Sequence, residues 1–159
     1  GDPTHRCVCT PGQIQRYMNK ISGPLLDRID IQCEISPVPF KDISTAAPGE
    51  PSAKIRERVI KAREIQAARF KDFKGIHCNA QMTERMIHQF AEPDEEGINL
   101  LRMAMEKLSL SARAYNRILK VARTIADLAG SECVEPFHLA EAIGYRTLDR
   151  GDWAERGHL

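Results

Sequence analysis

Residues 108–130 carry the clearest hydrophobic periodicity in the chain. Ser109 or Ser111 can cap the start of a helix here, and Gly130 stands where a left-handed residue would end it. Apolar side chains recur every three or four positions, as on one face of an α-helix: Tyr115, Ile118, Leu119, Ala122, Ile125, Ala126 and Ala129. Several polar residues lie off this stripe: Asn116, Arg117, Lys120, Arg123 and Asp127. The apolar face therefore has to be buried against other elements.

The same spacing predicts a long charged helix over residues 52–73. Ser52 can cap it, and its predicted buried side consists of Ile55, Val59, Ala62, Ile65 and the stem of Arg69. The other side carries many cations and few acids: Lys54, Arg56, Arg58, Lys61, Arg63, Lys71 and Lys74. Such a face is typical of a solvated surface, with contact to DNA or to another subunit as the alternatives.

Three further helices are predicted, at 83–90, at 95–108 and from Pro136 onward. Within the last one, His138 is expected to be a partly exposed helix residue. Together with the two long helices, residues 52–146 are predicted to form a compact bundle of about five helices with short connections. The fold class is therefore mainly α.

The first 51 residues have a different pattern. A helix is predicted from Pro11, with Thr10 as its cap, and alternating apolar and polar positions over 31–35 predict one strand. A single strand is unstable in water, so residues 1–40 are interpreted as a helix–loop–strand part of a larger sheet domain. The proline-rich residues 41–51 are predicted to be a connector, and 147–159, anchored by Trp153, a loosely held tail.

Composition agrees with a globular protein, because 42% of the residues are hydrophobic, 28% are charged and 6% are aromatic. A formal net charge of +1 excludes a global basic field, so any contact with nucleic acid has to be local. No apolar run approaches the length of a membrane span and no signal peptide pattern opens the chain, so no membrane association and a cytoplasmic location are expected. The abrupt start without methionine suggests a fragment.

Two arginines stand in unusual settings. Arg28 lies between two aspartates, and Arg113 falls in the first turn of a predicted helix, where the helix dipole disfavours a cation and free N–H groups favour an anion. An arginine beside such a helix end suggests a phosphate site, and a solvated surface arginine is the alternative. The chain has no G-x-x-x-x-G-K-[ST] loop, no nucleophile elbow and no H-E-x-x-H motif, so it is expected to catalyse nothing by itself.

Three N-terminal residues are candidate metal ligands, namely His5, Cys7 and Cys9. Thiolate and imidazole both suit zinc, but C-x-C is not the usual zinc spacing and no second cysteine pair follows nearby. Five cysteines in scattered positions do not form the pattern of a secreted disulfide framework. The residues alone favour a loop without metal.

Three segments together resemble a known family. They are residues 21–31 (ISGPLLDRIDI), residues 110–113 (LSAR) at a helix start, and residues 134–143 (VEPFHLAEAI). Their order, spacing and motif types are similar to the C-terminal part of the magnesium chelatase subunit I-like AAA+ ATPases. Within that family the resemblance is greatest to the ComM-type competence proteins, and it covers nearly all of residues 1–146.

The resemblance implies that residues 1–40 end an α/β ATPase core and that 52–146 are its helical lid. It implies that Arg28 is an arginine finger, which reaches the γ-phosphate held by the adjacent subunit. It also implies that Arg113 is the sensor two arginine, which touches the γ-phosphate and couples hydrolysis to lid movement. The family has a further Cys-Pro-Cys pair upstream of Cys7 and Cys9, so these two would supply half of a four-cysteine zinc site in an intact protein.

For the intact protein, the resemblance implies ATP with Mg²⁺ as cofactor, self-association as a ring, with a hexamer expected, and coupling of ATP hydrolysis to remodelling of DNA or translocation on it. The Walker A and B motifs would lie before residue 1, so this chain alone should be inactive. Two alternatives stay open. One is the ATPase subunit of a magnesium chelatase, and the other is a non-enzymatic helical module that binds DNA or protein.

Overall fold

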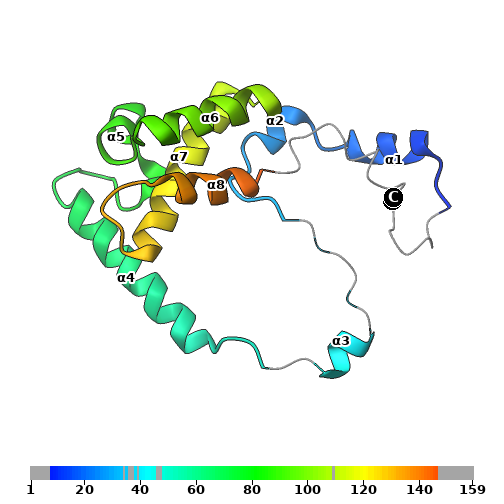
Figure 1. Cartoon of the computed structure of the whole chain (residues 1–159), viewed down its shortest axis with the longest axis horizontal. Coiled ribbons are helices and arrows are strands. Elements are labelled where there is room, and N and C mark those ends of the chain that lie inside the picture. The colour runs from blue at the N-terminus through cyan, green and yellow to red at the C-terminus, as the bar shows by residue number, and fades with distance from the viewer. Residues whose placement is uncertain are drawn as a thin grey trace.

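A computed structural model describes residues 8–33, 35, 38, 40–45, 48–108 and 110–146. These residues are mainly helical, as predicted, and contain no strand (Figure 1). The elements in chain order are α1 (Pro11–Met18), α2 (Gly23–Leu26), α3 (Phe40–Thr45), α4 (Ser52–Phe70), the 3₁₀ turn η1 (Asn79–Gln81), α5 (Glu84–Phe90), α6 (Glu95–Leu108), α7 (Ala112–Ala129) and α8 (Pro136–Gly144). None of the described helices is long and apolar enough to cross a membrane.

Helix α7 is the centre of the bundle and contacts α4, α5, α8 and η1, while α6 packs against α8. Its ends are those the sequence predicted. The Ser111 hydroxyl accepts a hydrogen bond from the Ala114 N–H at 3.2 Å, and Gly130 ends the helix with a φ of +72°. Five α-helices, α4 to α8, therefore make up the described part of 52–146, which is the predicted bundle.

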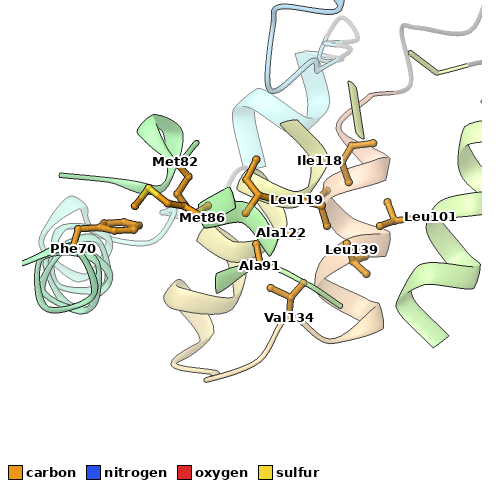
Figure 2. Close-up of a cluster of buried hydrophobic side chains, with 12 residues drawn as sticks. Phe70, Met82, Met86, Ala91, Leu101, Ile118, Leu119, Ala122, Val134 and Leu139 are labelled. Carbon is orange, nitrogen blue, oxygen red and sulfur yellow. The ribbon is translucent and has the colours of Figure 1, made fainter. Parts of the chain in front are cut away.

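The hydrophobic core is formed where α7 meets its neighbours. Ile118, Leu119 and Ala122 of α7 are buried, and Figure 2 shows them between Phe70 on one side and Leu101 on the other. Next to Phe70, the rings of Phe73 and Phe90 meet it and each other edge to face, with centroids 5.8–6.4 Å apart. Most of the apolar stripe predicted for this helix therefore lies in or against the core.

The buried face predicted for α4 is wrong at three positions. Ala62 is buried as expected, but the other buried residues are Gln66 and Phe70, and three predicted core residues are exposed: Ile55, Val59 and Ile65. Figure 1 shows the reason for the N-terminal half, because the first half of α4 extends beyond the bundle with no helix of the described residues beside it. Gln66 is buried because its side-chain oxygen accepts the Asn79 N–H at 3.1 Å.

Arg123 and Asp127, which the pattern placed off the apolar stripe, are both buried. Their burial is possible because each charge is paired. The Asp127 carboxylate accepts hydrogen bonds from Arg69 at 2.8 Å, from Asn79 at 2.7 Å and from Arg123 at 3.1 Å. Periodicity alone assigns such residues to the surface because their partners lie far away in the sequence.

His138, predicted to be partly exposed, is fully buried in α8. Its Nδ1 accepts a hydrogen bond from the Glu135 N–H at 3.1 Å, and this contact closes a capping box at the start of the helix. This capping contact holds the imidazole on the inner side of the helix. The pattern of apolar residues does not show such a contact, and for this reason the burial of His138 was not predicted.

The first 51 residues differ from the prediction in two places. Residues 31–33 and 35 form no strand, and the Gln32 N–H instead donates to the Tyr145 carbonyl at 2.8 Å. No neighbouring strand is present among the described residues to pair with this stretch. The predicted connector contains the short helix α3, which Figure 1 shows lying apart from the bundle. The predicted tail at 147–159 and its Trp153 lie outside the described residues.

Candidate phosphate-binding site

Both candidate arginines line one cavity of about 570 Å³. The cavity lies between the stretch that follows α2 and the outer face of α7, and residues of η1 and α8 complete its wall. Its lining residues are Arg28, Asp30, Ile31, Ala80, Arg113, Asn116, Arg117, Lys120, Val121, Thr124, Ile125, Leu128, Glu141 and Tyr145. One ligand in this cavity can therefore meet groups from distant parts of the chain.

Arg28 is exposed just beyond α2, the short helix that begins after Ser22. Its Nη1 donates to the Pro24 carbonyl at 2.7 Å, which holds the side chain against α2. Among the described residues no ion pair includes Arg28. Since a guanidinium has five N–H donors, most of its hydrogen-bonding capacity is available to a ligand.

Arg113 is the second residue of α7 and is exposed. The Ser111 cap satisfies the Ala114 N–H, so the first turn is held in place beside it. Within the described part of the chain, the Arg113 side chain has no hydrogen-bond or ion-pair partner. Arg113 is thus a cation kept in solvent at the positive end of a helix, where an anion would be favoured.

Two more cations of α7 line the cavity, and sequence reasoning missed their role. Arg117 and Lys120 follow Arg113 at i+4 and i+7, so all three lie on one face of the helix. The Lys120 Nζ donates to the Ala80 carbonyl at 2.9 Å. The spacing of the three basic residues was the signal that could have identified them, because it repeats the period of the helix.

The side chains that line the cavity include more cations than carboxylates. Arg117 forms an ion pair with Asp30, whereas Arg28, Arg113 and Lys120 have no carboxylate partner among the described residues. Burial lowers the pKa of Lys120, and the nearby charge of Arg117 lowers it further, while Asp30 and Cys78 oppose this effect. The clustered cations repel one another, and a bound polyanion would relieve that repulsion.

The rest of the lining contains both apolar and polar side chains. Three apolar residues line the cavity together with the cations: Ile31, Val121 and Ile125. A guanidinium forms short, charge-assisted hydrogen bonds with a phosphate, and these are often bidentate. The arrangement can therefore bind a phosphorylated ligand and stabilise negative charge that develops on it.

The zinc prediction at the N-terminus is not tested by the structure. Cys7 lies outside the described residues, and Cys9 is exposed. Within the described ranges, no group of three or more His, Cys, Asp or Glu side chains is placed to hold a metal ion.

Comparison with known proteins gives two family matches. The family model described as magnesium chelatase, subunit ChlI C-terminal, matches residues 49–146, and the model described as magnesium chelatase, subunit ChlI, matches residues 1–43.

Two curated relatives of the chain are each 44% identical to it over 89% of its length. They are the competence protein ComM of Haemophilus influenzae, over 142 residues, and the uncharacterized protein YifB of Escherichia coli, over 144 residues. The chain spans only 27% of the length of each.

Proposed function

Because the chain belongs to the magnesium chelatase subunit ChlI family, we propose that Arg28 and Arg113 act on one ATP molecule in a ring-forming AAA+ ATPase. The bundle of α4 to α8 is a lid of the AAA+ type, as the family match over residues 49–146 supports. The proposal concerns the activity to which this lid contributes.

One observation carries the proposal. Arg28 and Arg113 are far apart in the sequence, yet they line the same cavity, and neither has an ion-pair partner among the described residues. Exposed arginines usually have little energetic role on a surface. Two of them with free donors beside a third cation, Lys120, form a site suited to a triphosphate.

The chemistry follows from the charge that spreads over a transferred γ-phosphoryl group. A guanidinium already in place stabilises that charge without reorganisation, and an arginine finger contributes about 10³–10⁵ in rate. This sequence has no phosphate-binding loop, so the nucleotide, as its Mg²⁺ complex, is held by residues beyond this chain. Both arginines of one chain then act on a nucleotide held by the adjacent subunit. Arg28 reaches its γ-phosphate from the stretch after α2, and Arg113 contacts the same γ-phosphate from the lid.

We further propose that hydrolysis is coupled to work on DNA. The support is the similarity to the competence protein ComM and an exposed set of cations on and just after α4: Lys54, Arg56, Arg63, Lys71 and Lys74. Binding through such cations would weaken as salt increases. The ring is proposed to be a hexamer.

A second candidate is the ATPase subunit of a magnesium chelatase, which the description of the matching family favours. The two candidates differ in what stimulates turnover. DNA should raise the ATPase rate in the first case, whereas chelation of Mg²⁺ in the presence of partner subunits should be measurable in the second.

Replacing Arg28 or Arg113 by alanine in the full-length protein tests the shared part of the proposal. Each variant should lose ATP turnover by about 10³-fold or more, because one source of charge stabilisation is removed from the transition state. Arg102→Ala is the matched control, since Arg102 is also exposed, donates a hydrogen bond to Asn99, and does not line the cavity.

The measurement is steady-state ATP hydrolysis, with circular dichroism and the size of the assembly followed in parallel. Arg102→Ala should hydrolyse ATP at the wild-type rate. If Arg28→Ala and Arg113→Ala fold, assemble and also keep the wild-type rate, the proposal is wrong and the bundle is a non-enzymatic module.

A further inference from the structure

The two aspartates that flank Arg28 each face an arginine of the lid. Asp30 forms an ion pair with Arg117 of α7. On the other side, the Asp27 carboxylate lies 3.9 Å from the Nη2 atom of Arg146, at the end of α8. The segment that carries Arg28 is thus attached to two lid helices by charge.

Backbone contacts reinforce both attachments. The Arg146 Nη1 donates to the Ile29 carbonyl at 2.9 Å, and the Gln32 N–H donates to the Tyr145 carbonyl at 2.8 Å. Arg146 is almost completely buried, with 1% of its surface exposed. Breaking a contact of a buried guanidinium is costly, so the bond from Nη1 to the Ile29 carbonyl holds residues 27–32 against the bundle.

From these contacts we infer that Asp27 and Asp30 are positioning residues, which hold Arg28 in fixed relation to α7. The inference rests on the proposed function, because it concerns how the two arginines reach one phosphate. Arg28 itself is held only by the Pro24 carbonyl among the described residues, so its place relative to Arg113 depends on the aspartates beside it. Residues 27–32 and the lid then move as one body. A movement of the lid therefore carries Arg28 and Arg113 together towards the phosphate or away from it.

Breaking the ion pair between Asp30 and Arg117 can show whether it positions Arg28 or only stabilises the fold. Its two side chains are 34% and 48% exposed, and exposed ion pairs contribute little to stability. Loss of this pair should therefore leave the fold intact. A misplacement of about 1 Å near a reacting group can, however, reduce a rate by about 100-fold.

The test compares Asp30→Asn, Arg117→Gln and the charge-exchanged double variant Asp30→Arg/Arg117→Asp in the full-length protein. Each single variant should lower kcat by about 10–100-fold with little change in KM for ATP and in Tm, and the double variant should recover part of the loss. Glu57→Gln, which removes an exposed pair with Lys61 on α4, is the matched control and should have no effect.

A second measurement on the present chain follows the segment itself. Asp30→Asn should speed hydrogen exchange of the Gln32 amide by up to about fivefold, because its bond to Tyr145 opens more often, whereas the core amide of Leu119 should be unaffected.

Two outcomes separate this inference from the proposed function. If Arg28→Ala loses turnover while Asp30→Asn keeps the wild-type kcat, the positioning role is wrong and the proposed function stands. If Arg28→Ala itself keeps the wild-type rate, the proposed function fails and the positioning role fails with it. A double variant no faster than the single variants would also overturn the pairing.

Discussion

Asp127 is the charge around which the interior of the bundle is organised. Besides its bonds to Arg69 and Asn79, it faces Arg123, whose remaining donors reach the Ser131 carbonyl at 2.5 Å and the Glu132 carbonyl at 2.7 Å. Burial lowers the pKa of Arg123, and attraction to Asp127 opposes that shift. One carboxylate thus joins α4, η1, α7 and the loop before α8.

Removing this carboxylate should destabilise the fold strongly. Asp127→Asn leaves two guanidinium groups in the interior without a counter-charge, and breaking a buried pair in this way costs about 3–5 kcal/mol. Urea unfolding of this chain, followed by circular dichroism, measures the change in the free energy of unfolding. In the exposed pair with Lys61, Glu57→Gln should leave the free energy of unfolding almost unchanged, and equal losses in the two variants would contradict the role given to Asp127.

The sequence identified some residues of the candidate site and not others. Arg28 and Arg113 were singled out from their local settings, between two acids and at a helix start, which are visible in the chain itself. The pairing of Asp30 with Arg117 was not foreseen because it joins residues 87 positions apart. Long-range pairing has no periodic signature, so only the folded arrangement shows it.

Among the elements, α6 and α8 are in close contact at Gly97. A Cβ atom at this position would lie 2.7 Å from the Cβ of Pro93 and 2.7 Å from the Cδ1 of Leu139. The Gly97 N–H also donates to the Asp94 side chain at 2.8 Å, which caps the start of α6. Glycine is required here by space rather than by backbone conformation.

Gly97→Ala should therefore reduce the stability of the bundle. The added methyl group forces Leu139 to shift and meets Pro93, which cannot rotate away, and such overpacking costs about 1–3 kcal/mol. Gly144→Ala is the matched control, because no atom lies within 4 Å of a Cβ built there and the residue ends α8. Thermal unfolding should show a lower Tm for the first variant only. If both variants keep the wild-type Tm, the close approach of α6 and α8 does not constrain this position.

Helix ends were easier to predict than helix faces. The ends depend on local chemistry, such as the hydroxyl of Ser111 and the left-handed Gly130, and both were predicted correctly. The buried face of α4 was not, because Ile55 and Val59 have the right spacing but are each 43% exposed, in a half of α4 that has no described helix beside it. Periodicity says that a face is apolar, and the neighbouring elements decide whether it is covered.

For the molecule as a whole, the helical bundle was predictable and the first 51 residues were not. The core residues of the bundle pack against one another, so the apolar pattern of these helices has its partners within the same stretch of chain. Residues 31–33 follow the alternation of a strand without a neighbouring strand among the described residues, and Gln32 bonds to Tyr145 instead. A pattern that needs partners from elsewhere in a protein cannot specify its structure alone.

A structure of the full-length protein with Mg²⁺ and a non-hydrolysable ATP analogue tests whether both arginines serve one nucleotide. We expect a guanidinium nitrogen of Arg28 and one of Arg113, from the same chain, each within about 3.2 Å of an oxygen on a single γ-phosphate. Placement of the two arginines at different nucleotides, or of both away from any phosphate, would contradict the function proposed for this chain.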